Sequence, residues 1–477
     1  MKYINTKFTK IKRSAIGKTF ALCFLVLLLF VMLCACNRQK DEPMPIPSIC
    51  YDIVASYEES SDTLIATQEI LYTAPQDQTL DRIVLHVFPN AFEDENGKIE
   101  FLSVEMNKST VDHEIYGKDN TLMSIPCAMD KGQTCTITLV YTVTVPHTDA
   151  RLGITSEGTI NLTCFYPVIA KYDNGWREDV YSSIGDPFYT DISSFYVTFN
   201  CADNFLIASS GKITDETLSD GRKTVEIEAE NIRDFGMAIG QFNTQTLSAE
   251  VGKKEVNINY FYIDDASPEI SIDRTAQSIQ TFSSVFGAYP YDTFTVVQSG
   301  LDAGGMEYGS FVIIAPSENY DQYLDTITHE TAHQWWYNTV GNDQFNQAWL
   351  DEGLTEFCTS YFHYLNGDRQ AHTSVMARAD ETYRSFESIA KPTGFDGKMN
   401  KHLSEFLTQG EYVAVTYLKG ALMFETIRSL VGDTKFTAAL ATYYNNNKFA
   451  IATDKQLVSA FKTQGYDISS IVEYYTL

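Results

Sequence analysis

Residues 329–333 read HETAH and combine two histidines with a glutamate at a spacing that suits metal chemistry. In an α-helix, positions i and i+4 lie about 40° apart around the axis, so His329 and His333 would share one face and could bind one ion. Glu330 would lie about 100° around from His329, which makes it a poor third ligand but lets it reach a metal-bound water. The pattern favours a zinc site with a general base; the alternative is a helix with two histidines against a polar neighbour.

A second acidic segment can supply the ligand that this pattern lacks. A catalytic zinc ion takes three protein ligands and leaves one position open. The segment GNDQFNQAWLDEGLTEF (341–357) is predicted to begin a second helix, and Glu352 follows His333 after 18 intervening residues. We expect Glu352 to be the third ligand. Glu356, one turn further on, either accepts the free N–H of a ligand histidine or lies exposed in solvent.

Together these segments carry a family resemblance. HETAHQWW (329–336) followed by WLDEGLTEF (349–357) resembles the HExxH-x18-E signature of the gluzincin metallopeptidases, and specifically that of the membrane alanyl aminopeptidase family. The resemblance implies one Zn²⁺ per chain, bound by His329, His333 and Glu352, with Glu330 as general base. It also implies a thermolysin-like zinc domain and a peptide-hydrolysing enzyme.

A glycine-rich segment bears on which peptide bond is cut. Residues 304–308 read GGMEY and resemble the GAMEN exopeptidase motif of that family, whose glutamate pairs with the substrate's amino terminus. By this resemblance Glu307 would bind a free N-terminus, and Gly304 and Gly305 would let the substrate backbone approach in strand fashion. The sequence departs from the motif at Gly305, which replaces alanine, and at Tyr308, which replaces asparagine.

A tyrosine is expected to assist catalysis. The segment GEYVAVTYLKGALMF (410–424) resembles the helix of the same family that carries tyrosine, lysine and glycine. By that match Tyr417 would donate its phenolic O–H to the oxyanion of the transition state. The alternatives are that Tyr417 is an ordinary buried tyrosine, and that Tyr412 also approaches the site.

The hydrophobic pattern predicts a multidomain α+β chain. From residue 49 to residue 248, polar and apolar residues alternate in short runs separated by turn residues, which predicts an antiparallel β saddle or sandwich. Residues 249–477 are predicted to form the zinc domain, with a small mixed sheet followed by helices. In that domain the segment 267–287 reads as a helix, and FTVVQS (294–299) and SFVIIAP (310–316) read as strands.

The N-terminal segment is predicted to be a signal rather than part of the fold. Residues 1–35 combine a basic start with an apolar run, and LCAC (33–36) resembles a bacterial lipobox, so we expect lipid modification of Cys36. An uncleaved membrane anchor is the alternative. Residues 36–48 would form a proline-rich tether. Both interpretations place the remaining chain outside the cytoplasmic membrane. The net charge of −27 argues against nucleic acid as a partner.

Cysteines and the remaining histidines carry weaker signals. Cys127 and Cys135 flank a predicted hairpin and could form a disulfide, or they could be two unpaired strand cysteines. No metal-ligand spacing surrounds the six histidines outside HETAH, and we expect ordinary surface or strand residues at His86, His113, His147, His363, His372 and His402.

Taken together, the sequence predicts a surface-anchored zinc aminopeptidase that acts on peptides with a free N-terminus. A zinc endopeptidase and a catalytically silent peptide-binding scaffold are the alternatives. Many members of the family carry a further C-terminal helical domain over the site. This chain ends about 60 residues after Tyr417, so we expect a more open cleft.

Overall fold

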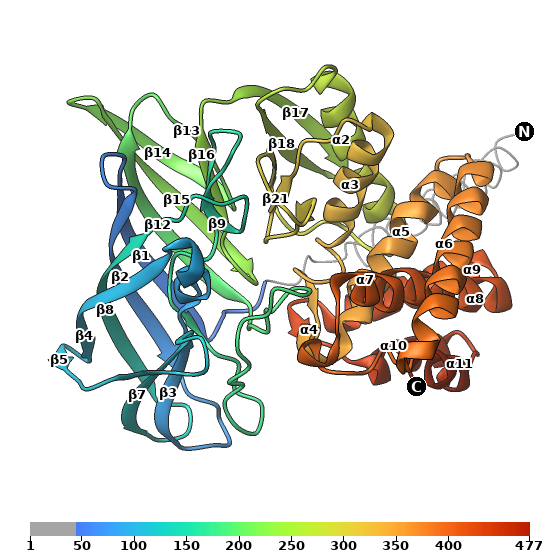
Figure 1. Ribbon diagram of the computed structural model, residues 1–477, viewed down its shortest axis with the longest axis horizontal. Coiled ribbons are helices and arrows are strands. Elements are labelled where there is room, and N and C mark those ends of the chain that lie inside the picture. The colour runs from blue at the N-terminus through green and yellow to red at the C-terminus, as the bar shows by residue number, and fades with distance from the viewer. Residues whose placement is uncertain (1–43) are drawn as a thin grey trace, which may run out of the picture. The chain divides into compact units, whose positions relative to one another are not determined.

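The first half of the chain is built from β-strands, as the alternating pattern predicts. The computed structural model describes residues 44–477, and residues 46–477 form one unit (Figure 1). The predicted signal peptide, most of the tether and Cys36 lie outside the described residues. Between residues 44 and 477, no helix has the length and apolar character needed to cross a membrane.

An eight-stranded sheet is the largest element of this half. Buried and solvent-facing side chains alternate along its central strands, which explains the alternation in the sequence. All its pairings are antiparallel except that of β1 with β12. In sheet order, the strands are β14 (Lys212–Ser219), β15 (Arg222–Ile232), β12 (Ser193–Ala202), β1 (Ile49–Glu58), β2 (Thr63–Thr73), β8 (Thr134–Thr144), β4 (Lys98–Met106) and β5 (Ser109–Thr110).

Two four-stranded sheets complete the β half. One contains β13 (Leu206–Ser209), β16 (Met237–Gly240), β10 (Ile160–Leu162) and β9 (Leu152–Ile154), and the other contains β11 (Val168–Ile169), β3 (Leu80–His86), β7 (Leu122–Met129) and β6 (Glu114–Tyr116). A short 3-10 segment, η1 (Phe88–Glu95), follows β3. Cys127 on β7 and Cys135 on β8 therefore belong to different sheets rather than to one hairpin ladder, and both are free thiols in the described chain.

A five-stranded mixed sheet begins the second half. Its order is β17 (Asn243–Val251), β18 (Lys254–Tyr262), β19 (Thr293–Gln298), β21 (Phe311–Ile314) and β20 (Gly305–Met306), and α2 (Pro268–Phe286) packs on β17 and β18. The predicted helix and strands of this region are confirmed. The domain boundary predicted after residue 248 falls inside β17, so the sheet itself begins at Asn243.

Helices make up the remainder of the second half (Figure 1). The elements around the site are α3 (Tyr320–Ala332), α4 (Gln344–Gln347), η2 (Ala348–Leu350), α5 (Glu352–Leu365), α6 (Arg369–Ala390), α7 (Gln409–Tyr412) and the π-helical η5 (Val413–Lys419). The others are η3 (Lys391–Thr393), η4 (Leu403–Glu405), α8 (Gly420–Val431), α9 (Asp433–Asn447), α10 (Asp454–Thr463) and α11 (Ser469–Thr476), with the short strands β22 (Val340–Gly341) and β23 (Ala450–Ile451). The predicted α+β architecture is confirmed.

Buried polar bonds join the two halves and fix the site between them. Arg233, 2% exposed, follows β15 and donates to the carbonyl oxygens of Tyr337 and Thr190. The hydroxyl groups of Thr163 and Tyr308 lie 2.6 Å apart across the same boundary. Because unpaired buried polar groups are costly, these bonds specify how the β half sits against the second half.

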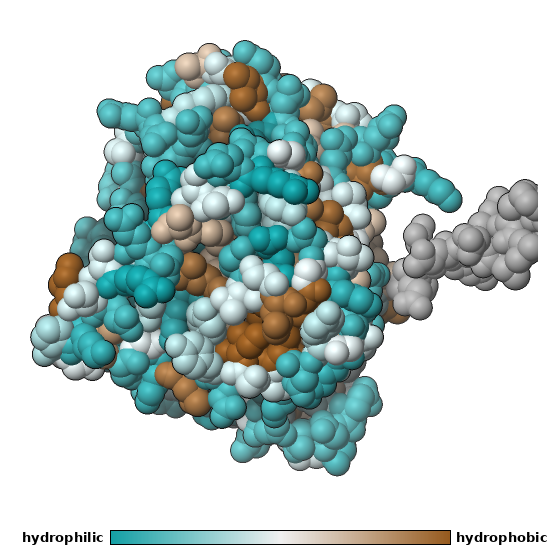
Figure 2. Space-filling model, turned by 90° about the vertical axis from the view of Figure 1, so that its right-hand side faces the viewer, coloured by the Kyte–Doolittle hydropathy of each residue, from teal (hydrophilic) through white to brown (hydrophobic). Residues whose placement is uncertain are grey.

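The surface agrees with the acidic composition. Figure 2 shows a face on which hydrophilic residues predominate, with one hydrophobic area near its lower centre and smaller, scattered hydrophobic areas elsewhere. The chain carries 62 acidic and 35 basic residues, so a water-exposed, negatively charged exterior is expected.

Candidate active site

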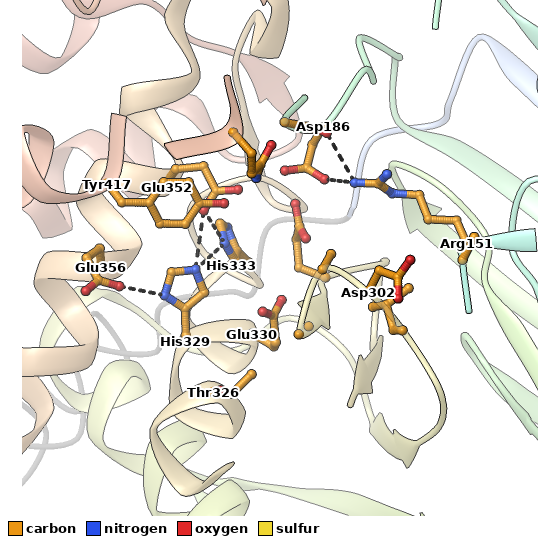
Figure 3. A pocket seen from close by; sticks show the side chains of 18 of the residues that line it. Arg151, Asp186, Asp302, Thr326, His329, Glu330, His333, Glu352, Glu356 and Tyr417 are labelled. Carbon is orange, nitrogen blue, oxygen red and sulfur yellow. Dashed lines mark hydrogen bonds and ion pairs between the residues drawn. The ribbon is translucent and has the colours of Figure 1, made fainter. Parts of the chain in front are cut away.

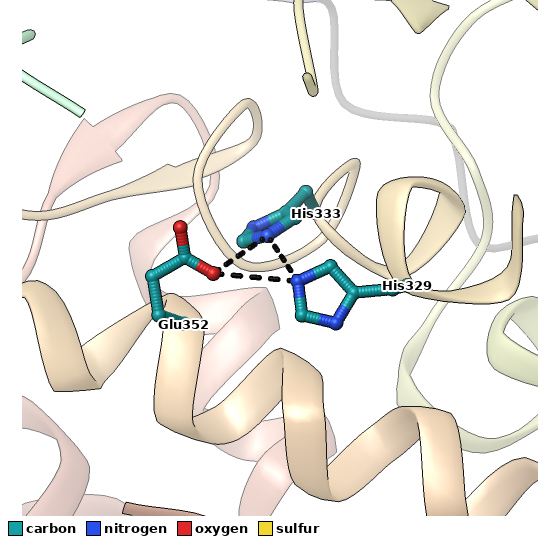
Figure 4. A group of neighbouring side chains, drawn as sticks. All are labelled: His329, His333 and Glu352. Atoms are coloured by element: carbon teal, nitrogen blue, oxygen red, sulfur yellow. Dashed lines mark hydrogen bonds and ion pairs between the residues drawn. The ribbon is translucent and has the colours of Figure 1, made fainter. Parts of the chain in front are cut away.

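Three side chains from two helices converge on one point (Figure 4). The Nε2 atoms of His329 and His333 lie 3.1 Å apart, and Glu352 Oε2 lies 3.3 Å from the first and 3.2 Å from the second. With zinc–ligand bonds of roughly 2.0–2.1 Å, tetrahedral ligands lie about 3.3 Å from one another. The nearly equilateral triangle therefore fits one face of a zinc tetrahedron, with the fourth position left to water or substrate.

Local structure explains why these residues meet. The Asn319 side chain accepts from the Gln322 N–H and starts α3, which presents His329 in its last turn and His333 at its C-terminal cap. His333 Nδ1 lies 3.0 Å from the Trp336 carbonyl oxygen, so Nδ1 carries the proton and Nε2 is left free for a metal. Glu352 is the first residue of α5, whose N-terminus is capped by Asp351.

The outer nitrogen of His329 also has partners. His329 Nδ1 lies 3.4 Å from Glu356 Oε2 and 3.4 Å from Thr359 Oγ1, both on α5. Of the two roles considered for Glu356, the structure thus favours the first, because Glu356 lies beside His329, a candidate metal ligand. Burial opposes protonation of His329, but its bonds with Glu352 and Glu356 outweigh burial and raise its pKa well above the ordinary value. Protons and a metal therefore compete for the same imidazole.

Glu330 points into the same space without a partner of its own. It is 5% exposed, and its Oε2 has no hydrogen-bond partner among residues 44–477. Gly305 makes room for it, because a Cβ at Gly305 would lie 2.2 Å from Glu330 Oε1. Burial raises the pKa of Glu330 to about 7, and the two histidines act in the opposite direction. A carboxyl group with such a pKa can both take up and release a proton near neutral pH.

Glu307 lies beside this cluster at the end of an edge strand. It follows β20, the outermost strand of its sheet, and β20 has no strand on its outer side in the described chain. One carboxylate oxygen from each of Glu307 and Glu330 and one ring nitrogen of His333 could share a cation, since these atoms lie within 4.8 Å of one another. The Oε1 atom of Glu307 has no hydrogen-bond partner among the described residues. Tyr308, by contrast, is not among the residues that line the cavity, and its buried hydroxyl group contacts that of Thr163.

Asp186 and Arg151 are site residues that the sequence analysis missed (Figure 3). Both come from loops of the β half, and Arg151 Nη2 makes a short ion pair with Asp186 Oδ1. Donor atoms of Asp186, Glu307 and Glu352 lie within 4.8 Å of one another. No periodic pattern marks loop residues; the only sequence signal is the position of Asp186 between a glycine and a proline.

The cavity at the site concentrates negative charge. Its volume is about 760 Å³. Five buried carboxyl groups surround it or support it, and burial raises the pKa of four of them: Asp186 (to about 6), Glu330 (to about 7), Asp351 (to about 7) and Glu307. The pKa of Glu352 is instead held well below the usual range, because the two histidines outweigh burial. Arg151, whose side chain is 11% exposed, pairs with Asp186, and the other four carboxyl groups have no arginine or lysine partner in the described chain, so this arrangement favours cationic ligands.

Tyr417 lines the cavity, and the ring of Tyr412 packs against that of Tyr417. The Tyr417 ring stacks on His329 with centroids 5.9 Å apart and planes 9° apart. Tyr412 is buried, and Gly185, beside Asp186, packs directly against it, since a Cβ at Gly185 would lie 2.7 Å from the Tyr412 ring. Burial raises the pKa of Tyr417 well above the ordinary value, so its phenol remains a proton donor.

The other six histidines lie outside the metal-binding triad, although His363 lines the cavity. None of the six is among the potential metal-binding groups of residues 44–477. The prediction of ordinary surface or strand residues is wrong for His372, which is buried on helix α6 and lies 2.8 Å from Ser360 Oγ. Apolar packing between α5 and α6 covers this histidine, and the local sequence gives no sign of it.

Comparisons with known proteins agree with the geometry. The Peptidase family M1 domain matches residues 270–475. Leucine aminopeptidase 2 of Candida glabrata is 26% identical over a match that covers 54% of this chain and 41% of the relative. Aminopeptidase N of Rattus norvegicus is 23% identical over a match that covers 39% of this chain and 21% of the relative. The chain thus spans less than half the length of these curated relatives.

Solved structures share the fold over nearly the whole length of both chains. The M1 zinc metallopeptidase of Deinococcus radiodurans, as a mutant, is similar with a TM-score of 0.69 at 18% identity, over 90% of this chain and 94% of that one. The same mutant bound to a Tyr-Ser-Ala substrate gives a TM-score of 0.68. From the sequence match and the shared fold, we conclude that this chain is a two-domain protein that carries a peptidase family M1 domain over residues 270–475.

Proposed function

We propose that the chain is a zinc aminopeptidase that removes N-terminal residues from peptides. One observation carries this proposal: a triad that fits zinc lines one cavity together with Glu330 and Glu307, each of which has one oxygen with no hydrogen-bond partner among the described residues. The names of the relatives, leucine aminopeptidase and aminopeptidase N, support the same activity.

The residues of the chain divide the chemistry among them. A zinc ion held by His329, His333 and Glu352 would polarise the scissile carbonyl and lower the pKa of the attacking water. Glu330 takes the proton of that water and passes it to the leaving amine. The Tyr417 hydroxyl donates a hydrogen bond to the oxyanion.

The amino terminus of the substrate sets the point of cleavage. A free α-ammonium group pairs with Glu307, whose Oε1 has no hydrogen-bond partner among the described residues, and with a second carboxyl group, that of Asp186, beside it. Arg151 holds Asp186 in place from the β half. The outer edge of β20 offers backbone groups for strand-like pairing with the substrate. Cleavage then falls after the first residue.

We also propose that the protein works outside the cytoplasmic membrane, anchored by a lipid on Cys36. The support is the lipobox-like LCAC and the basic, apolar segment before it. Fractionation of cells that produce the full chain tests this: the wild type is expected with membranes and a Cys36→Ala variant is not. Equal partition of the two proteins would overturn the lipid anchor.

The activity is tested with a panel of aminoacyl chromogenic substrates, with and without a chelator. Hydrolysis that chelation abolishes and zinc restores is expected. Glu330→Gln should retain zinc and lose at least about a thousandfold in kcat, in the range seen for essential acid–base groups. A wild-type protein that binds zinc but hydrolyses no member of the panel would favour a binding or scaffold role.

A further inference from the structure

The catalytic cavity extends beyond the zinc triad toward the helices. Asp186 and Arg151 lie on one side of His329 and His333, and Glu356 lies on the other (Figure 3). The cavity on this second side is lined by residues of α3, α5 and α6: Gln322, Asp325, Thr326, Glu356, His363, Val375 and Arg378. If the protein is an aminopeptidase as proposed, the substrate's ammonium group lies at Glu307. The substrate residues after the scissile bond must then extend toward the side of the cavity formed by α3, α5 and α6.

Arg378 is the unusual side chain there. Each other arginine between residues 44 and 477 has an ion pair, a backbone bond or an aromatic ring as a partner, and Arg378 has none. The nearby His363 is already paired with Asp325, at 3.0 Å. In a chain with 62 acidic and 35 basic residues, Arg378 is thus the lining cation that remains available to an anionic ligand.

The register of two helices places Arg378 near the metal site. Helices α5 and α6 form a hairpin in which Ser360 contacts His372 and Arg369 lies over the Tyr364 ring. Continuing this antiparallel register for six residues beyond His372 brings Arg378 level with Leu354 and Thr355, between Glu352 and Glu356 and about 3–4.5 Å along α5 from Glu352. One extended residue spans roughly 3.3–3.6 Å, so the C-terminus of a peptide of two to four residues can reach this level.

We propose that Arg378 binds the C-terminal carboxylate of short peptide substrates, so that the enzyme prefers di-, tri- and tetrapeptides with a free C-terminus. The guanidinium group is always charged and matches a carboxylate with two parallel N–H donors. Because Arg378 is exposed, its effect should be modest and should weaken as salt rises. This inference rests on the proposed aminopeptidase function, which sets the direction of the bound peptide.

The test compares tripeptides of the form X-Gly-Gly with their C-terminal amides, where X is the residue that the chromogenic panel favours. We expect KM for the acid to be about three- to tenfold lower than for the amide, with similar kcat. Arg378→Gln should raise KM for the acid to that of the amide, and Arg378→Glu should reverse the preference. Arg384→Gln is the matched control, because Arg384 lies on the same helix, pairs with Asp380 and does not line the cavity.

Binding can be measured apart from catalysis. Titration of the zinc-loaded Glu330→Gln protein with the uncleaved acid and amide should show the same three- to tenfold preference, and adding Arg378→Gln should abolish it. Equal KM values for acid and amide in the wild type would overturn the role of Arg378 and leave the aminopeptidase function standing. Failure to cleave both peptides would overturn the proposed function itself.

Discussion

Gly353 and Gly420 bring helices α5 and α8 into direct backbone contact. A Cβ on Gly353 would lie 2.9 Å from the Gly420 Cα, and a Cβ on Gly420 would lie 2.8 Å from the Gly353 Cα. Gly353 follows the proposed ligand Glu352, and Gly420 lies three residues after Tyr417. The contact therefore sets the distance between the third zinc ligand and the proposed oxyanion donor.

Adding a methyl group at this contact should separate the two helices. We expect Gly420→Ala and Gly353→Ala to lower the free energy of unfolding by about 1–3 kcal/mol, as overpacking does, and to lower kcat. Chemical denaturation and kinetics measure both effects. Gly410→Ala is the control, because a Cβ there meets no atom closer than 3.9 Å, and it should be neutral or slightly stabilising. Unchanged stability of Gly420→Ala would show that the helices do not depend on the contact.

Measurements of zinc content should distinguish Glu352, a proposed zinc ligand, from Glu356, which is proposed only to orient His329. Glu352→Gln should lose stoichiometric zinc, because only two imidazoles would remain in the triad. Glu356→Gln should retain the site but bind zinc roughly 10- to 100-fold more weakly, since Glu356 orients His329 from outside the triad. Competition with a chromogenic chelator measures both affinities. Zinc binding by Glu352→Gln at wild-type affinity would remove Glu352 from the ligand set.

The two neighbouring tyrosines should respond differently to loss of the hydroxyl group. Tyr417→Phe should lower kcat by about 10²- to 10³-fold with little change in KM, as expected for a donor used only in the transition state. Tyr412→Phe should have a much smaller effect, because Tyr412 does not line the cavity. Steady-state kinetics on the best substrate shows which tyrosine is the oxyanion donor. A larger loss of kcat in Tyr412→Phe than in Tyr417→Phe would assign that role to Tyr412 instead.

His86 should make the fold sensitive to acid. Burial lowers the pKa of His86 to about 4, against an ordinary value of 6.5. The unfolded chain therefore binds more protons than the folded one, and this contribution to stability is present above pH 6.5 and is lost as the pH falls toward 4. The loss amounts to about 3 kcal/mol.

Denaturation at several pH values tests this. The difference in stability between the wild type and His86→Gln should shrink by that amount between pH 7 and pH 4. His113→Gln, the same substitution at an exposed position, is the control. A difference between wild type and His86→Gln that stays constant with pH would contradict the prediction.

The sequence was most informative where chemistry depends on local spacing. The i, i+4 pair His329 and His333 needs only a helix to face one ion, and the strands of the β half were evident from alternation. Glu307 and Tyr417 were placed by family resemblance rather than by spacing, and the structure brings both to the cavity wall.

The features of the site that the sequence does not predict depend on contacts between segments that are distant along the chain. Asp186 and Arg151 reach the site only because the β half packs against the zinc domain, and loop residues carry no periodic signal. Likewise, the close approach of Gly353 and Gly420 joins segments 67 residues apart, since 420 − 353 = 67. A single sequence does not encode such pairings in a readable pattern.

Cleavage of a free peptide and of its N-acetylated twin tests the central claim most directly. Acetylation removes the ammonium group that Glu307 and Asp186 are proposed to bind, leaving the buried carboxyl group of Glu307 unpaired. We predict that kcat/KM falls by about 30- to 1,000-fold, the effect of losing one partner of a buried charge pair. Glu307→Gln should lose most of this discrimination. Equal rates for the two wild-type reactions would contradict the account and identify an endopeptidase with the same metal site.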